Sequence, residues 1–431
     1  MIRSLNNGRA GLTSYQQGID VIANNIANIN TTGYKTKSVV FSDMLSQNMK
    51  GASAGNELSS STNPKQIGLG VRVAATRTAI NKQGAMESSD NVFDMYLKGN
   101  SFFVVEKDGA NGYTKSGIFG LDEGGNLVCR SSGYYVQGWT SLDGETVDTT
   151  TEPGILHLLD EENLKYYAEP SSQARLKGNL NPSDPSLYRD GRSASMSVVD
   201  ENGATYTVQL TISSTADDEA NAFELVMDRI EDAEGNELIF PEENLPIRMA
   251  FSAETGNILT VNGQAATTAT LQIPPEIPGV GQLTIDLTQL TMRPEEGGLV
   301  AIPGGLDGSG AGKPLAGLRD YSVGQDGIIH GLYANGGSRV LGQIAVAQFQ
   351  NPLGLAMDGD VYRQTVNSGE NTLLTADNAR SKIYNKMLES SNVDTAEEFT
   401  RMILMQRAFQ ANSKVIKTSD EMLTVAKDLK R

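Results

Sequence analysis

The segment VIANNIANINTTGYK (Val21–Lys35) places several asparagines close together at the end of a predicted amphipathic helix. Across and ahead of it, apolar residues recur at steps of three and four, the spacing of a helix that packs against another helix. These residues are Leu12, Tyr15, Ile19, Ile22, Ile26 and Ile29. Asparagine is a mediocre helix former, because its amide competes for nearby backbone groups. Since glycine adopts positive φ readily, we expect Gly33 to provide the exit from the helix.

The predicted N-terminal helix is weak on its own. Gly8, Gly11 and Gly18 each lower its stability by about 1 kcal/mol relative to alanine. A helix of this kind stays ordered only when another element packs against it.

The last 37 residues predict a second helix with the same spacing. One face carries Met402, Met405, Phe409, Asn412, Ile416, Ser419 and Leu423, followed by Ala426. Another face carries Leu404, Ala408, Ala411, Val415, Met422, Val425 and Leu429. Apolar residues on two faces indicate burial on more than one side. We therefore expect the two terminal helices to pair as a coiled coil and then to pack against other copies of the chain.

Between the helices the pattern favours β-structure. Short alternating runs are bounded by Gly, Asn and Asp, as in SFFVVEKDGANGYTK (residues 101–115). SASMSVVDENGATYTVQLTISS (residues 193–214) predicts a hairpin that turns at Asn202–Gly203. Two stretches resemble linkers, KGASAGNELSSSTNP (Lys50–Pro64) and GGLDGSGAGKP (Gly304–Pro314).

Charge and composition exclude several classes of protein. The net charge is −17, and residues 141–250 hold 23 acidic against 7 basic residues, so no basic footprint for nucleic acid exists. No apolar run approaches the roughly 20 residues of a membrane-spanning helix. The N-terminus lacks the features of a cleaved secretory signal, so we expect a cytoplasmic protein or one exported by another route.

Nothing in the sequence indicates catalysis, a metal or a cofactor. Cys129 lies in the apolar context NLVC and is expected in the core, and His157 and His330 have no neighbours at metal-ligand spacing. Gly312–Lys313 fails the phosphate-loop pattern because Pro314 follows where Ser or Thr is required. A pair of carboxylates of the glycosidase type stays open on sequence alone, although aromatic residues for sugar stacking are scarce.

Several segments together resemble the bacterial flagellar axial proteins, that is, the rod, hook and hook-associated families. VIANNIANINTTGYK and the following SVVFSDMLSQ resemble their N-terminal signature. The segment SSNVDTAEEFTRMILMQRAFQANSKVIKTSDEMLTVAKDLKR resembles their C-terminal helix. LKGNSFFVV and GQDGIIHGLYANGGSRVLGQIAVAQFQNPLGLAMDGD resemble the β-domain shared by hook and distal-rod proteins.

An insertion of about 170 residues between Trp139 and Pro314 favours the hook branch, since distal-rod proteins lack one. The expected fold is mainly β with α-helical termini. It comprises a terminal coiled coil (residues 1–35 and 393–431), an extended connector (36–75), an inner β-domain (76–140 and 315–392) and an inserted acidic outer β-domain (141–314).

The resemblance implies a non-enzymatic subunit that polymerises into a flexible tube, the hook, which transmits torque from rod to filament. Implied partners are other copies of the chain, the distal rod, the hook cap, the hook–filament junction protein and the flagellar type III export apparatus. The implied location is the extracellular flagellar hook, reached without a cleaved signal. Alternatives are a distal-rod or hook-associated protein, and a secreted carbohydrate-active or adhesive β-protein.

In such a tube the asparagines acquire a role. Asn24, Asn25 and Asn28 lie off the apolar spacing, so we expect them to face neighbouring subunits, where neutral amides avoid burying unpaired charge. Some spirochaete hook proteins join subunits through a cysteine of the outer domain, whereas Cys129 falls in the predicted inner domain.

Overall fold

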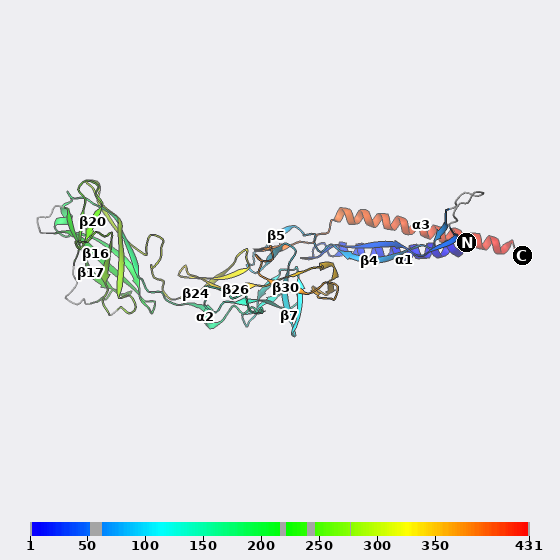
Figure 1. Cartoon of the computed structure of the whole chain (residues 1–431), viewed down its shortest axis with the longest axis horizontal. Coiled ribbons are helices and arrows are strands. Elements are labelled where there is room, and N and C mark those ends of the chain that lie inside the picture. Colours follow the sequence, from blue (N-terminus) through cyan, green and yellow to red (C-terminus); the bar gives the residue numbers. More distant parts are fainter. Residues whose placement is uncertain (1, 52–62, 216–220, 239–245, 276, 430–431) are drawn as a thin grey trace, which may run out of the picture. The chain divides into compact units, whose positions relative to one another are not determined.

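A computed structural model describes residues 2–51, 63–215, 221–238, 246–275 and 277–429. The chain divides into two compact units. Unit 1 comprises residues 1–159, 321–330 and 340–431, and unit 2 comprises residues 160–320 and 331–339. Figure 1 gives the element labels used below.

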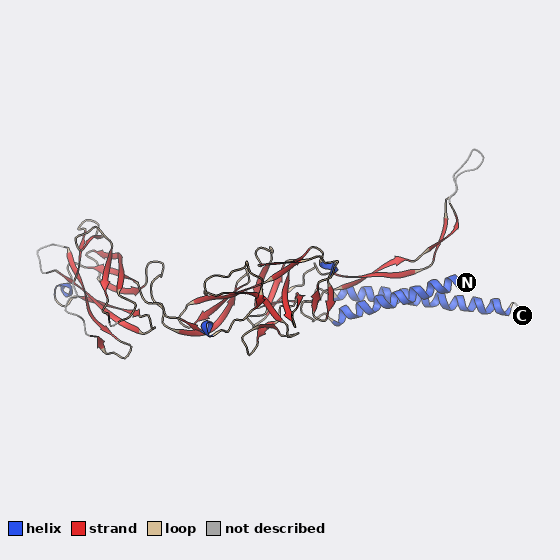
Figure 2. Cartoon of the chain, turned by 60° about the horizontal axis from the view of Figure 1, so that its bottom comes forward, coloured by secondary structure: helices blue, strands red, loops and turns tan. Residues whose placement is uncertain are grey.

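The two ends of the chain form long helices within unit 1. Helix α1 spans Ile2–Ala27 and helix α3 spans Thr395–Asp428. They run side by side, as Figure 2 shows in blue, and they are antiparallel because Ser4 meets Ser419 while Gly18 meets Met405. Helix α3 begins at a good cap, since the Asp394 carboxylate accepts hydrogen bonds from the backbone N–H groups of Ala396 and Glu397.

A long antiparallel hairpin follows α1. Strand β1 (Lys37–Asp43) pairs with β4 (Val71–Thr78), and β2 (Ser46–Lys50) pairs with β3 (Lys65–Gly68). Both β1 and β4 contact α1, and the Tyr15 ring lies 5.6 Å from the ring of Phe41. Helix α1 therefore packs against α3 and also against a hairpin of its own chain.

The rest of unit 1 is a β-domain. Its central strands follow one another in the order β26-β11-β7-β8-β29-β28 within a larger sheet. The strands wholly within this domain are β5 (Met86–Ser88), β6 (Met95–Lys98), β7 (Phe102–Lys107), β8 (Ala110–Thr114), β9 (Phe119–Leu121), β10 (Leu127–Cys129), β11 (Tyr135–Thr140), β12 (Gly154–Ile155), β27 (Val346–Phe349), β28 (Ala356–Asp358), β29 (Val361–Arg363), β30 (Asn371–Leu374), β31 (Lys382–Asn385) and β32 (Met387–Glu389). A short 3₁₀ helix spans Pro352–Gly354.

Three further strands of that sheet have residues in both units. They are β24 (Ala316–Val323), β25 (Ile328–Tyr333) and β26 (Ser338–Ile344). The core of the β-domain in unit 1 consists of buried side chains, among them the fully buried Phe103, Leu127 and Ile344. It also includes Cys129. The expectation that Cys129 is a buried core residue is confirmed.

Unit 2 contains two sheets. One has the order β15-β16-β17-β19-β20 with β18 beside β17, and the other has the order β21-β22-β14-β23. Its elements are α2 (Glu161–Leu164), β13 (Lys165–Tyr166), β14 (Gln173–Leu180), a 3₁₀ helix (Pro185–Tyr188), β15 (Arg192–Val199), β16 (Thr205–Ser214), β17 (Ala222–Glu231), β18 (Glu237–Leu238), β19 (Ile247–Phe251), β20 (Ile258–Val261), β21 (Thr268–Gln272), β22 (Gln282–Met292) and β23 (Gly298–Pro303).

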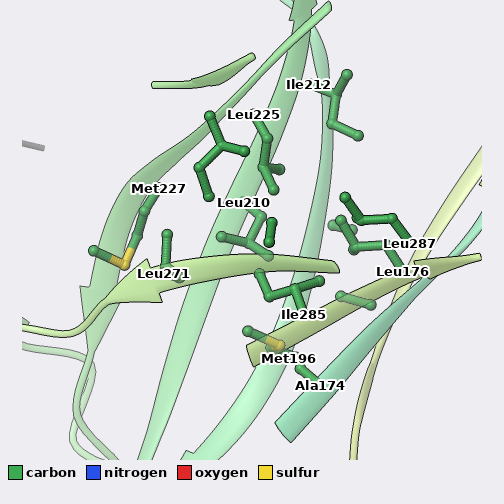
Figure 3. Packing of buried hydrophobic residues seen from close by; sticks show 14 of the residues in the cluster. Ala174, Leu176, Met196, Leu210, Ile212, Leu225, Met227, Leu271, Ile285 and Leu287 are labelled. Carbon is green, nitrogen blue, oxygen red and sulfur yellow. The ribbon is translucent and has the colours of Figure 1, made fainter. Parts of the chain in front are cut away.

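The two sheets of unit 2 share one hydrophobic core. Alternate residues of their strands point inward, and Figure 3 shows Leu210, Leu225 and Ile285 among them. This alternation is the pattern of sheets with one buried and one solvated face. By sequence, unit 2 carries 26 acidic against 11 basic residues, so most of the net negative charge belongs to it.

The expected fold class is confirmed: the chain is mainly β and its terminal helices pack together. The hairpin predicted at Asn202–Gly203 is also confirmed, since β15 pairs with β16 and Gly203 has φ +87°. The predicted linker at Lys50–Pro64 lies largely outside the described residues. Strands β1 to β4 occupy most of the described part of residues 36–75, where we expected an extended connector.

Candidate assembly site

The contact between α1 and α3 is built on glycine. A Cβ added at Gly8 would lie 2.9 Å from Ile416 Cγ1, and one added at Gly11 would lie 2.6 Å from Asn412 Oδ1. A larger residue at either position would force the Ile416 or Asn412 side chain, or the helices themselves, to shift. The glycines that lower the stability of an isolated α1 therefore permit close approach to α3, and packing offsets their cost.

Three of the residues predicted for assembly, Met405, Asn412 and Ile416, meet glycines of α1 at this contact. Ile22 is buried, and the others on the apolar spacing are partly buried: Leu12, Tyr15, Ile19, Ile26, Ile29, Met402, Met405, Phe409, Asn412, Ile416 and Leu423. Asn412 also donates a hydrogen bond from Nδ2 to Ala408 O, which satisfies its amide within α3. Tyr15 differs from the rest in that its ring lies against Phe41 of the hairpin.

The second apolar face of α3 is exposed. We call it the α3 stripe: Leu404, Ala408, Ala411, Val415, Met422, Val425 and Leu429. Its large side chains are between 43% and 83% exposed, and Met422 is 60% exposed. The stripe extends over 26 residues, about 37 Å of helix. An apolar face of that length, interrupted at Thr418, indicates an interaction surface.

Asn25 does not face outward. Its side chain is fully buried, donating from Nδ2 to Lys37 O at 2.7 Å and to Glu398 Oε2 at 3.0 Å. Its Oδ1 accepts from Lys37 N at 2.9 Å and from the Tyr34 hydroxyl at 3.1 Å. The prediction that Asn25 meets a neighbouring subunit is therefore wrong. The physical reason is that the chain after α1 folds back and covers this amide.

The neighbouring asparagines and Gly33 shape the exit from α1. Asn24 is exposed and accepts from the Tyr34 hydroxyl at 2.8 Å, and Asn28 is partly buried and donates to Asn24 O at 2.8 Å. Gly33 has φ +72°, and its N–H donates to Glu389 O at 2.7 Å. The predicted positive φ at Gly33 is confirmed, although α1 itself ends earlier, at Ala27.

A buried ion pair lies at this exit. Lys35 Nζ is 2.7 Å from Glu389 Oε1, with both side chains at most 2% exposed. Lys35 also donates to Lys82 O, and Gly84 N donates to Glu389 Oε1. Among the described residues, Glu389 Oε2 has no hydrogen-bond partner. Such a pair, once one partner is lost, leaves a costly unpaired charge.

A second buried lysine stands close to this pair. Lys115 Nζ donates to Gly99 O at 2.7 Å and lies 5.0 Å from the centre of the Phe102 ring. Burial, together with the positive charge of Lys35, lowers the pKa of Lys115 from 10.5 to about 7, although the negative charge of Glu389 opposes the shift. Lys115 is thus held near its point of deprotonation at neutral pH.

Asn392 ties the start of α3 to the exit from α1. Its Oδ1 accepts from Thr36 N at 2.7 Å, and its Nδ2 donates to Lys82 O at 2.7 Å and to Ala79 O at 3.1 Å. We call Asn25, Lys35, Glu389, Asn392 and Glu398 the junction. Periodicity could not reveal it, because its members are polar and bond to residues distant in sequence. The clustering of amides in Ala23–Asn30 was the signal that pointed to it.

Neither a metal centre nor a membrane helix is found in the part of the chain that the structure describes. No cluster of three or more His, Cys, Asp or Glu side chains there could hold a metal ion. No helix within the same residues is long and apolar enough to cross a bilayer.

Family models match the chain at both ends and in the β-domain of unit 1. They are the "Flagella basal body rod protein" model at residues 5–35, the "Flagellar hook protein FlgE/F/G D1 domain" model at residues 96–155, and the "Flagellar basal body rod FlgEFG protein C-terminal" model at residues 384–429. The flagellar hook protein FlgE of Borreliella burgdorferi is 34% identical to the chain, with 98% of each protein covered. The chain belongs to the flagellar hook protein family.

Other hook proteins match over the same extent. FlgE of Treponema pallidum is 31% identical, with 100% of each chain covered, and FlgE of Rhizobium meliloti is 33% identical, with 99% of each covered. Because these matches cover nearly the whole of each chain, they include residues 160–320, so the inserted region also resembles the corresponding region of the hook proteins. The chain is accordingly a structural hook subunit concerned with motility, and the family is not enzymatic.

Proposed function

We propose that this chain builds the hook by homopolymerisation through its terminal helices, forming a flexible tube that transmits torque from rod to filament. The α3 stripe carries the proposal. Helix α1 is packed on two sides within its own chain, whereas α3 is packed on one and leaves the stripe exposed. Burying it against other copies would remove a large apolar surface from water, which is the main driving force for association.

The proposed site comprises the predicted assembly residues that line the helix pair, together with the α3 stripe. The helix pair positions the stripe, and the junction fixes where both helices leave the β-domain of unit 1. Asn24 and Asn28, which are exposed or partly buried, remain proposed contacts to neighbouring subunits. The four-part division into coiled coil, connector, inner and outer β-domains is proposed with the boundaries given above.

Family membership supports further partners. We propose that the polymer meets the distal rod at one end and, during growth, the hook cap and the hook–filament junction protein at the other. The subunit would reach this extracellular place through the flagellar type III export apparatus without losing a signal peptide.

The test is a substitution on the stripe. Met422→Asp in the full chain should place a carboxylate in the subunit contact and abolish hooks, as counted by electron microscopy of cells that lack the native protein. Swimming should be lost with them. The purified variant should stay soluble at concentrations at which the unchanged protein sediments as polymer.

Gln410→Asp is the matched control, because Gln410 is exposed on α3 but lies off the stripe. It should assemble hooks of ordinary number and length. Normal hooks made of the Met422→Asp chain would refute assembly through the stripe.

A further inference from the structure

A groove lies along α1 beside the hairpin that follows it. It has a volume of about 630 Å³ and lies between the first turns of α1 and the hairpin. Its apolar lining is Ala10, Met44, Leu69, Val71 and Val73. Arg3, Arg9 and Arg72 also line it, with no carboxylate among the lining residues.

The hairpin is fastened to α1 at this place. Ser14 Oγ donates to Val71 O at 3.0 Å, within the groove lining. Gly70 has φ +109°, and a Cβ there would lie 3.1 Å from the Ala10 Cβ. Glycine therefore allows the hairpin to touch the helix, so the groove is a fixed feature of unit 1.

Positive charge lines the groove, and one carboxylate, that of Asp43, adjoins it, because Asp43 precedes the lining residue Met44 and pairs with Val71. The three arginines of the groove are exposed, and among the described residues none of them forms an ion pair. Arg72 makes a side-chain hydrogen bond from Nε to Ser42 Oγ, at 3.3 Å. The lining combines five apolar residues and three cations with five neutral polar residues, which are Asn6, Asn7, Thr13, Ser14 and Gln17. Such a mixed surface fits a segment that carries both apolar side chains and carboxylates.

The end of α3 has that chemistry. Met422, Val425 and Leu429 are 60%, 59% and 83% exposed. Glu421 and Asp428, also exposed, lie seven residues apart and so share one face beside the apolar residues. The segment Glu421–Leu429 thus presents an apolar strip with two carboxylates along one side, while its one cation, Lys427, lies on the side away from the strip.

This segment cannot enter the groove of its own chain. Ser4 Oγ bonds Ser419 Oγ at 3.0 Å and Gly8 touches Ile416, which holds α3 against a different face of α1. Gln17, a groove residue, lies nine residues from Gly8, two and a half turns along, so the two point to opposite sides of the helix. A Glu421–Leu429 segment that fills this groove therefore belongs to a second copy of the chain.

We propose that the groove receives the Glu421–Leu429 segment of α3 from a second copy, with Glu421 and Asp428 facing Arg3, Arg9 and Arg72. The contact joins two different surfaces of the subunit. Contacts of this kind that do not close on themselves generate open helical polymers. The inference rests on the proposed homopolymerisation and names the surface that would accept the α3 stripe.

Charge reversal tests the contact in the full chain. Arg9→Glu with Arg72→Glu should raise the concentration needed for polymerisation on the order of tenfold or more, and Glu421→Arg with Asp428→Arg should do the same. The chain carrying all four changes should recover most of the loss, because the opposite charges meet again across the contact. Sedimentation of purified protein measures polymer, and circular dichroism measures folding.

Arg77→Glu is the matched control, since Arg77 is exposed on β4 outside the groove lining, and it should polymerise as the unchanged chain does. Unchanged polymerisation of either doubly reversed chain overturns the docking inference but leaves homopolymerisation standing. The docking inference is also overturned if the chain that carries all four changes polymerises no better than the doubly reversed chains. Failure of the unchanged protein to polymerise would instead overturn the proposed function.

Discussion

At the scale of the residue, the junction concentrates polar groups where a helical protein usually places apolar ones. Asn25 satisfies both the N–H and the C=O of Lys37, so one amide replaces the hydrogen bonds that a neighbouring strand would supply. It also donates to Glu398, a carboxylate that is 2% exposed. An apolar side chain at position 25 would leave three groups without partners, which explains why an amide occupies this helical position.

Lys115 should make stability depend on pH. Its pKa is about 7 in the folded chain against 10.5 ordinarily, so between these values the unfolded chain binds more protons. Stability therefore rises with pH through this window, by at most about 1.4 kcal/mol per pH unit, and the full cost of the buried charge is present below pH 7. Denaturant titrations at several pH values should show a flatter dependence for Lys115→Met.

Lys115→Met should be at least as stable as the unchanged chain at pH 6.5 (about half a unit below that pKa), since Gly99 O keeps a hydrogen bond from Gln83 Nε2. Lys98→Met, at an exposed position, is the control and should follow the unchanged protein at every pH. If the unfolding free energies of Lys115→Met and of the unchanged chain depend equally on pH, Lys115 is not the cause of the pH dependence.

At the scale of the element, α1 is the centre of a three-part arrangement. Helix α3 lies against its glycine-bearing face, the hairpin lies against another, and the junction closes its end. The hairpin turns a marginal helix into one that is packed on two sides before any other copy arrives. Helix α3 is therefore the element that keeps an apolar face, the α3 stripe, exposed within the single chain.

Ile22→Asp should separate the helix pair. Ile22 is 5% exposed, so the change buries an unpaired carboxylate and should cost roughly 3–5 kcal/mol. Helical circular dichroism should fall while the strand signal persists, and cells should make no hooks. Ala23→Asp, at the exposed neighbouring position, should leave both unchanged. Intact helix content in the Ile22→Asp protein would contradict this account of α1.

The elements differ in how far the sequence alone could predict them. The terminal helices were predictable because their apolar spacing is regular, and observed bounds of Ile2–Ala27 and Thr395–Asp428 lie inside the predicted ranges. The pairing of β1 with β4 was missed, because polar and small residues such as Ser42, Ala74 and Thr76 mask the alternation. The Lys35–Glu389 pair was unpredictable, since the partners are 354 residues apart and only the fold joins them.

At the scale of the whole molecule, the chain holds separate hydrophobic cores. Among the residues that the structure describes, the core of unit 2 contains 29 buried residues between Ala174 and Ala301, whereas that of the β-domain in unit 1 draws on residues from Phe93 to Ile383. The net charge is divided in the same way as the cores, because unit 2 carries most of the excess of acidic over basic residues.

Matched core substitutions should therefore act on different unfolding transitions. Leu210 in unit 2 and Leu127 in unit 1 are both fully buried, and Leu→Ala at either should cost about 2–5 kcal/mol. Scanning calorimetry should show Leu210→Ala lowering one transition and Leu127→Ala lowering the other. A single transition shifted equally by both would contradict separate cores.

The hydrogen bond between Ser4 and Ser419 has a consequence for timing. It joins residues 415 positions apart, near opposite ends of the polypeptide. Closing so long a loop is an unfavourable, late event in folding, and it is impossible while either end is still confined or unmade. During synthesis the helix pair therefore cannot form until α3 has been made. Until then the glycine-bearing face of α1 lacks the helix that packs against it.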